Sequence, residues 1–387
     1  MSDARRLFIH VGLQKTGTSY LQAALLNSRD RLAAQGLDLV PPSKRECFEL
    51  MVVVRNRYAA RRDPESDRAT VERFTTQLDK APGSRAVFSQ ESLAAAGPGQ
   101  IQRLLAACGD REVHVVITAR DLARQLPSAW QEDLKAGGTT GFGSYLRGLQ
   151  AQERAGKART PWIHLDPPAV ASRWAAALSA DRVQVVTVPP PGSPTDLLLE
   201  RFARVLEVDP AQLEPEQSPS NSSLGLVQAE VLRRVNAELP EAVHRRYVYG
   251  DVVKRSFGAQ VLGAQERRRI LVPDRFRSWC VEVADRQVVE LEKAGYPVEG
   301  SLEDLRCADA AFAEAGAKAS EREVAAASVT ALATILARQG TAEAERRTGL
   351  IRVGGDGLLP RIRRRLGSRT GVADVTEHAD HSDEADG

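Results

Sequence analysis

A glycine-containing loop near the start of the chain, Gly12–Ser19, holds the residue types that bind phosphate. A strand-like run, Leu7–Val11, precedes it, and a helical pattern follows from Thr18. Glycine lets backbone N–H groups approach an oxygen closely, and the first turn of a helix adds partial positive charge. Lys15 adds a full charge, and the hydroxyls of Thr18 and Ser19 add donors. The order of strand, loop and helix therefore predicts an anion site.

This loop departs from the Walker A pattern of nucleoside triphosphatases. Gly12 and Gly17 have the right spacing, but Thr18 stands where that pattern has its lysine. A lysine at that place bridges the β- and γ-phosphates beside Mg²⁺, whereas Lys15 lies inside the loop and suits a single 5′-phosphate with its leaving-group oxygen. The spacing disfavours a P-loop phosphotransferase or hydrolase, and no metal is expected. A capped helix with incidental glycines is the alternative interpretation.

A second anion site is indicated further along the chain. Arg120 follows the apolar run Val113–Ala119, and Ser128 comes eight residues later on the next helical segment. A guanidinium offers a fixed fork of donors to a dianionic phosphate, and a serine hydroxyl can complete such a site. Taken alone, the pattern is equally well explained by an ion pair between Arg120 and Asp121, with Ser128 as an ordinary helix residue.

Together the two segments resemble a known family. Sulfotransferases bind the 5′-phosphosulfate of 3′-phosphoadenosine-5′-phosphosulfate (PAPS) with a Lys-(Ser/Thr)-Gly-Thr-(Thr/Ser) loop, which resembles Lys15-Thr16-Gly17-Thr18-Ser19. Their 3′-phosphate site, an arginine followed eight positions later by a serine, resembles Arg120 and Ser128. Many members have proline two places after this arginine, where this chain has Leu122. The resemblance is strong over residues 7–131, weaker to about 240 and absent beyond 300.

The resemblance implies a P-loop NTPase-like fold of the bacterial type and an activity. A sulfuryl group would pass from PAPS to a hydroxyl or amine of a carbohydrate, lipid or small metabolite. PAPS would then be bound by Gly12, Lys15, Thr16, Gly17, Thr18, Ser19, Arg120 and Ser128. Asn221-Ser222-Ser223-Leu224 is similar to an Asn-x-Ser-Leu pattern of bacterial relatives, which adds Asn221 and Ser223. The Arg-Lys-Gly triplet of cytosolic eukaryotic members is missing, and Lys254-Arg255 is a candidate substitute.

Two side chains are candidates for the catalytic base. Glu91 follows the strand-like run Arg85–Ser89, where cytosolic sulfotransferases have a histidine and those that modify heparan sulfate have a glutamate. By this resemblance Glu91 is the first candidate, although a favourable charge at a helix start would explain it too. His164, in the loop-rich segment Gly137–Pro168 where we expect the acceptor, is the second. His10 and His114 lie within strands and are expected to be packed there.

Five apolar runs alternate with helical patterns over the first two hundred residues, which predicts a three-layer α/β/α fold with a central parallel sheet. The expected strands are 7–11, 37–40, 85–89, 113–118 and 183–188. The C-terminal part is mostly helical, with Ser222 or Ser223 as the expected cap of a helix that ends at Leu239. We expect one α/β domain over residues 1–300, a helical appendage over 301–345 and a largely disordered charged tail over 346–387.

Composition limits the class of protein. The chain has 387 residues and a net charge of +2, which argues against a general nucleic-acid binder. The resemblance to sulfotransferases implies a small-molecule or glycan acceptor as the partner. Its four cysteines form no C-x-x-C pair, which favours reduced thiols and a cytoplasmic setting. No run of 18 apolar residues is present, although the basic segment 346–369 is a candidate for peripheral membrane contact. The sequence leaves a non-catalytic nucleotide-binding module as an alternative and says nothing of oligomeric state.

Overall fold

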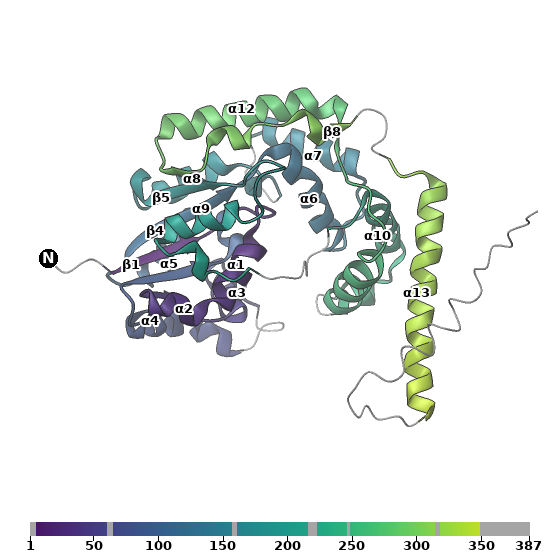
Figure 1. Ribbon diagram of the computed structural model, residues 1–387, viewed down its shortest axis with the longest axis horizontal. Coiled ribbons are helices and arrows are strands. Elements are labelled where there is room, and N and C mark those ends of the chain that lie inside the picture. The colour runs from purple at the N-terminus through teal and green to yellow at the C-terminus, as the bar shows by residue number, and fades with distance from the viewer. Residues whose placement is uncertain are drawn as a thin grey trace, which may run out of the picture. The chain divides into compact units, whose positions relative to one another are not determined.

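The computed structural model describes residues 5–59, 65–156, 161–215, 223–245, 248–313 and 318–348. Its centre is a parallel six-stranded sheet with the order β2-β3-β1-β4-β5-β7 (Figure 1). The strands are β1 (Arg6–His10), β2 (Leu37–Leu39), β3 (Arg85–Ser89), β4 (Glu112–Ala119), β5 (Val183–Thr187) and β7 (Val298–Glu299). The five predicted strands are therefore confirmed, and the short β7 is an addition beside β5.

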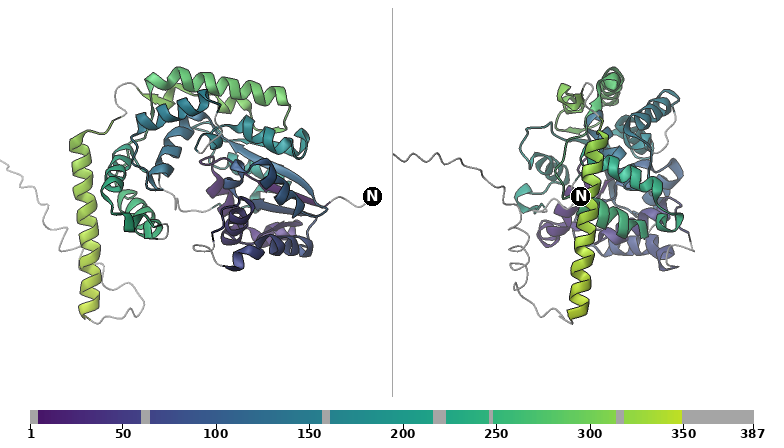
Figure 2. Two further views of the ribbon diagram at one scale, coloured as in Figure 1. Left: turned by 180° about the vertical axis from the view of Figure 1, so that it is seen from behind. Right: turned by 90° about the vertical axis from the view of Figure 1, so that its right-hand side faces the viewer.

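Helices cover both faces of this sheet (Figures 1 and 2). Alternating strand residues such as Phe8 and Val116 pack on one face against α1, α2 and α9. Their neighbours, such as Ile9 and Val115, pack on the other against α3, α4, α5, α8 and α12. These helices are α1 (Thr18–Asn27), α2 (Arg29–Ala34), α3 (Lys44–Val54), α4 (Thr70–Lys80), α5 (Pro98–Ala106), α8 (Pro167–Ala175), α9 (Leu197–Leu206) and α12 (Arg277–Ala294). The predicted three-layer α/β/α architecture is thus confirmed.

The remaining elements extend this core. They are α6 (Leu122–Leu134), α7 (Phe142–Arg154), α10 (Leu226–Glu238), the π-helix η7 (Tyr249–Leu262), α13 (Glu321–Thr348) and a two-stranded parallel sheet of β6 (Val272–Pro273) and β8 (Phe312–Ala313). Short 3₁₀ turns are η1 (Glu65–Ala69), η2 (Glu91–Ala95), η3 (Trp162–His164), η4 (Ala180–Arg182), η5 (Pro210–Gln212), η6 (Glu241–His244), η8 (Asp274–Phe276), η9 (Leu302–Leu305) and η10 (Asp309–Ala311). No described helix has the length and apolar character needed to cross a membrane.

Several local expectations differ from the structure. The segment 137–168, expected to be rich in loops, contains α7, whose apolar side Phe142, Leu146 and Leu149 is buried. The helix expected from Thr18 to Ala34 is interrupted at Ser28 and continues as α2. α10 begins after Gly225 with no side-chain cap, so Ser223 does not cap it, and Ser222 lies outside the described residues. Each difference arises because tertiary packing outweighs a local turn or cap signal.

The chain divides into two compact units, residues 1–332 and 333–387. The boundary expected near residue 300 lies inside the first unit, because residues 298–313 supply β7 to the main sheet and β8 to the small one. Most of the charged tail expected over residues 346–387 lies outside the described residues.

Candidate active site

The candidate residues gather at one edge of the sheet. β3, β1 and β4 are neighbours and parallel, so their carboxyl ends meet at the same edge. Glu91 follows β3, the loop Gly12–Ser19 follows β1, and Arg120 follows β4. The strand order therefore places the loop between the glutamate and the arginine.

Left-handed backbone at three positions shapes the loop. Gly12, Lys15 and Gly17 have φ angles of 44°, 69° and 89°. A Cβ atom on Gly12 would lie 2.5 Å from the Cγ2 atom of Thr18, and one on Gly17 would lie 2.6 Å from a methyl group of Leu198. Both positions therefore require glycine. Lys15 holds a strained conformation in which non-glycine residues are rare, as is common where a loop binds a ligand.

The loop offers a row of free donors. Among the described residues, the backbone N–H groups of Gln14 through Ser19 donate to no other group. Gly17 precedes the first residue of α1, and no side chain caps this end of the helix. Unpaired amides and the positive end of a helix dipole form an anion site without further groups. The loop therefore has the backbone geometry that an anion site requires, and its binding of phosphate stays a prediction.

A buried polar chain supports the loop from below. The Thr16 hydroxyl donates to the Leu13 carbonyl at 2.6 Å and lies 2.7 Å from the Thr118 hydroxyl. His10 lies 3.2 Å from the same Thr118 hydroxyl and 2.8 Å from that of Ser89. Thr16 is fully buried, so its side chain stabilises the loop and cannot contact a ligand. Only its backbone N–H group is available to one. Burial lowers the pKa of His10 to about 3, which keeps it neutral, as expected for a packed strand residue.

Lysines gather at the open side of the loop. The Lys15 ammonium lies 2.9 Å from one oxygen of Glu132, and the Lys254 ammonium lies 2.6 Å from the other. Burial raises the pKa of Glu132, but the two lysines reverse this and leave it at about 2. Burial and the charge of Lys15 lower the pKa of Lys135, whose environment also includes Glu132 and Lys254. Two lysines thus pair with one carboxylate and a third lies in its field, which leaves a surplus of positive charge beside the loop.

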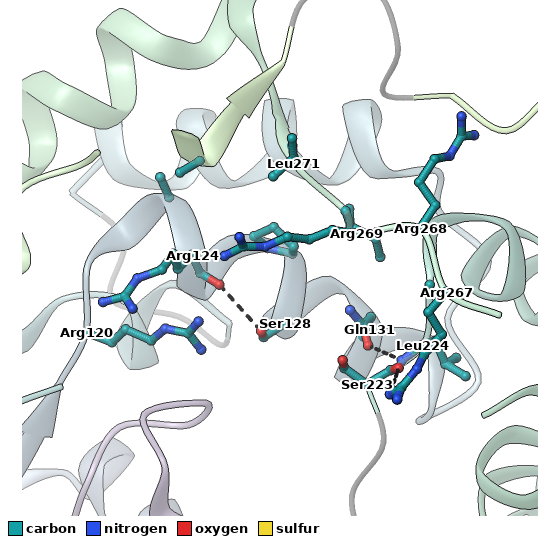
Figure 3. A pocket seen from close by; sticks show the side chains of 15 residues that line it. Arg120, Arg124, Ser128, Gln131, Ser223, Leu224, Arg267, Arg268, Arg269 and Leu271 are labelled. Atoms are coloured by element: carbon teal, nitrogen blue, oxygen red, sulfur yellow. Dashed lines mark hydrogen bonds between the residues drawn. The ribbon is translucent and has the colours of Figure 1, made fainter. Parts of the chain in front are cut away.

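Arg120 and Ser128 line one cavity of about 340 Å³ (Figure 3). α6 carries Ser128 about two turns beyond Arg120, because Asp121 caps the start of the helix. One Arg120 N–H group donates to the Lys15 carbonyl at 3.2 Å, which connects this cavity to the loop. The Nε of Arg120 is buried without a partner, and no carboxylate of the described chain pairs with the Arg120 guanidinium. Asp121 pairs with Arg124 instead.

Burial, with the nearby Arg124, lowers the pKa of Arg120 to about 10. The guanidinium therefore stays charged at neutral pH while it is held inside the protein. A buried cation with an unused donor is a stronger anion site than an exposed one, since little water competes for it. This observation favours an anion site over the alternative ion pair.

Sequence reasoning missed four arginines of this cavity. They are Arg124 on α6 and Arg267, Arg268 and Arg269, which lie between η7 and β6. Figure 3 shows the Arg269 side chain pointing toward Arg124, whereas that of Arg268 points away and bonds the Lys318 carbonyl at 3.1 Å. Three consecutive arginines were the signal that could have found them, but nothing local indicates which cavity they join.

The remaining cofactor candidates have mixed outcomes. Ser223 lines the arginine cavity, and its carbonyl accepts from Arg267 at 3.2 Å. Asn221 lies outside the described residues. Lys254-Arg255, the candidate substitute for the missing triplet, does not reach this cavity: Lys254 pairs with Glu132 near the loop, and Arg255 pairs with Asp251 in solvent.

Glu91 lines a second cavity, of about 100 Å³. Glu91 is the first residue of the 3₁₀ turn η2. One of its carboxylate oxygens accepts a 2.9 Å hydrogen bond from the side-chain amide of Gln22 on α1. The amide thus holds the carboxylate against the helix that begins at the phosphate-cradling loop. Glu91 is consequently accessible from a cavity, as a base must be.

His164 is placed differently from Glu91. It is 3% exposed, lines neither of the two cavities, and its Nδ1 has no partner within the described part of the chain. Burial, with the charges of Arg55, Arg173 and Arg57, lowers its pKa to about 4. A side chain enclosed in this way cannot reach an acceptor hydroxyl, so the geometry favours Glu91 over His164 as the base.

Burial of His164 should make stability depend on pH. In the unfolded chain its pKa is about 6.5, so as pH falls from 6.5 toward 4 the unfolded state binds a proton that the folded state does not. The free energy of unfolding should therefore fall by up to about 3 kcal/mol over this range. Urea titrations at pH 7 and pH 4.5 measure this loss. His164→Gln should reduce it, and the exposed His244→Gln should not; equal losses in the two variants would contradict the assignment.

Among the described residues, no three His, Cys, Asp or Glu side chains gather as a metal site would require. No family model matches this chain, and no curated protein matches it. Among solved structures, it is similar to the crystal structure of a sulfotransferase from Alicyclobacillus acidocaldarius at 18% sequence identity, with a TM-score of 0.35. That match covers 63% of this chain and 100% of the other.

Proposed function

We propose that this protein is a sulfotransferase that takes its sulfuryl group from PAPS and passes it to a hydroxyl acceptor. The observation that carries the proposal is the pair of anion sites joined by Arg120. One is the cradle of free N–H groups over Gln14–Ser19, and the other is the arginine cavity with Ser128. The Arg120 hydrogen bond to the Lys15 carbonyl connects them. A nucleotide with separate 5′ and 3′ phosphate groups matches such a pair.

The residues present fit this cosubstrate. The loop amides and the ammonium of Lys15 would hold the 5′-phosphosulfate, and Arg120, Ser128 and the neighbouring arginines would hold the 3′-phosphate. When bound, PAPS supplies an activated sulfuryl group whose leaving phosphate gains negative charge. Lys15 and the loop amides would stabilise the charge on that phosphate, which is the main means of catalysis open to such a site. Glu91 accepts the proton of the acceptor hydroxyl.

A P-loop phosphotransferase fits less well. Its lysine would be at position 18, where Thr18 is buried, and a metal-binding Asp would be expected after a strand. Asp121, which follows β4, already accepts hydrogen bonds from the Arg124 backbone and side chain. A non-catalytic binding module shares the two anion sites, and only activity distinguishes it from the enzyme.

Nucleotide binding tests the proposal. Isothermal titration should show that adenosine 3′,5′-bisphosphate binds at least about tenfold more tightly than AMP, because hydrogen bonds to a charged group contribute roughly 1.5–3 kcal/mol each. ATP, which lacks the 3′-phosphate, should bind no better than AMP. Equal affinity for the three nucleotides, or no binding of the bisphosphate, would exclude PAPS as the donor.

A further inference from the structure

One wall of the arginine cavity has no regular secondary structure of its own. Residues 265–271, here called the arginine segment, lie between η7 and β6 and are neither helix nor strand. Three of them, Arg267, Arg268 and Arg269, line the cavity. Ordering an irregular chain costs conformational entropy at each residue, so contacts from neighbouring elements must hold this wall in place. Those contacts decide how well the wall can bind an anion.

The start of α10 holds the arginine segment from one side. The Arg268 carbonyl accepts from the Leu226 backbone N–H group at 2.8 Å, and the Gln228 side-chain amide donates to the Glu266 carbonyl at 3.0 Å. The approach is close, because a Cβ atom on Gly225 would lie 3.0 Å from the Arg268 backbone nitrogen. These contacts fix the backbone of the segment and leave the Arg268 side chain for another partner.

The side chains of Arg268 and Arg269 point in different directions (Figure 3). Arg269 extends toward Arg124, whereas Arg268 extends away from it. The Arg268 guanidinium donates to the Lys318 carbonyl at 3.1 Å and lies 3.2 Å from the Glu323 carboxylate. Arg268 therefore contacts the start of α13 with its side chain, although its neighbour on the same segment faces the cavity.

Glu323 is itself held in place by a capping box at the start of α13. Its Oε2 atom accepts from the Ser320 backbone N–H group at 2.7 Å, and the Ser320 hydroxyl accepts from the Glu323 N–H group at 3.3 Å. Its other oxygen lies 3.2 Å from Arg268. Because the capping box already orders the Glu323 side chain, the ion pair costs less entropy than a pair between two free side chains.

Further contacts bring the first turns of α13 against the same elements. The Gln265 side-chain amide of the arginine segment donates to the Ala327 carbonyl at 3.1 Å. Arg234 on α10 pairs with both oxygens of Glu321 at 2.7 Å. Val324, between these contacts in the sequence, is 5% exposed. The start of α13 therefore packs against α10 and the arginine segment together.

We propose that Arg268 and Glu323 are positioning residues of the nucleotide site: the start of α13 holds the arginine segment so that Arg269 faces the cavity. The proposal rests on the sulfotransferase function proposed above, in which this cavity receives the 3′-phosphate. It gives a role to a part of the chain beyond residue 300, where the resemblance to sulfotransferases is absent. Only ligands with a group in the cavity should sense this role, and AMP has none.

The test reverses the charge of Glu323. Glu323→Arg adds positive charge near the cavity, which by its field alone would tighten the binding of an anionic nucleotide. If position matters instead, loss of the pair and repulsion from Arg268 displace the segment. The ratio of the affinity for adenosine 3′,5′-bisphosphate to that for AMP should then fall about three- to tenfold, as expected when an exposed pair becomes a repulsive one. The two explanations predict opposite signs, and isothermal titration of the full chain measures the ratio.

Three further variants complete the design. Arg268→Glu combined with Glu323→Arg should recover most of the ratio, because two charges 3.2 Å apart change places. Glu323→Gln keeps a side chain suited to the capping box and should lower the ratio about twofold, so it decides the matter if Glu323→Arg does not fold. Glu292→Arg, the same change at an exposed residue of α12, should leave the ratio at its wild-type value.

The outcomes separate this role from the proposed function. AMP affinity near the wild-type value in the same titrations verifies that a variant is folded. An unchanged or higher ratio in the Glu323 variants, or no recovery in the double variant, would overturn the positioning role. The proposed function stands in those cases as long as the wild type prefers the bisphosphate. If the wild type binds both nucleotides equally, the function and the positioning role fail together.

Discussion

Lys15→Ala is expected to lower the rate of sulfuryl transfer by about 10²- to 10³-fold, the usual loss when one preorganised donor is removed from a developing anion. Lys15 is part of the loop itself and extends its ammonium beside the cradle, where Glu132 holds it at 2.9 Å. The loss should appear mainly in kcat, because the charge on the leaving phosphate grows in the transition state. Affinity for adenosine 3′,5′-bisphosphate should fall much less, since the loop amides and the arginine cavity remain.

The structure also indicates that Lys15→Ala will fold. Removal of Lys15 does not leave Glu132 as an unpaired buried charge, because Lys254 remains 2.6 Å from its other oxygen. Alanine at a left-handed position loses a little stability but has no bulk to clash. Lys293→Ala, a change at an exposed helix end, is the matched control and should retain the wild-type rate. A Lys15→Ala enzyme with wild-type kcat would remove Lys15 from the catalytic assignment.

The second large effect concerns Arg120. Arg120→Ala should weaken the binding of adenosine 3′,5′-bisphosphate by roughly 10- to 100-fold, because a hydrogen-bonded charge pair with little competing water is lost. AMP has no 3′-phosphate, so its affinity should change little. The informative quantity is therefore the ratio of the two affinities, measured by isothermal titration, which should fall toward one.

The ratio also separates a binding role from a structural one. Arg120 donates to the Lys15 carbonyl, so a damaged loop would weaken both nucleotides together and leave the ratio unchanged. Arg255→Ala, which removes an exposed arginine paired with Asp251, should leave both affinities as they are. An unchanged ratio in Arg120→Ala would show that the 3′-phosphate does not bind in the arginine cavity.

Much of the fold was predictable because its signals are local. An apolar run between turn residues is a property of neighbouring residues, and burial of both faces of a parallel sheet follows from it. The strand β7, with only two residues, has no such run and forms because β5 offers it an open edge. Helix α7 lies where the sequence predicts a loop-rich segment, and it forms because its apolar side packs into the protein interior.

The candidate site divides in the same way. The sequence alone predicted an anion-binding loop, because Gly12, Lys15 and Gly17 lie within a few residues between a strand and a helix. For Arg120 and Ser128 the spacing left an ion pair equally open, and the resemblance to sulfotransferases indicated an anion site. Only the tertiary structure decided that Arg267–Arg269 line the cavity of Arg120 and that Lys254 meets Lys15 at Glu132. It also decided that Glu91 lines a cavity while His164 is enclosed. These relations depend on which elements pack together, and packing is set by the whole core rather than by neighbouring residues.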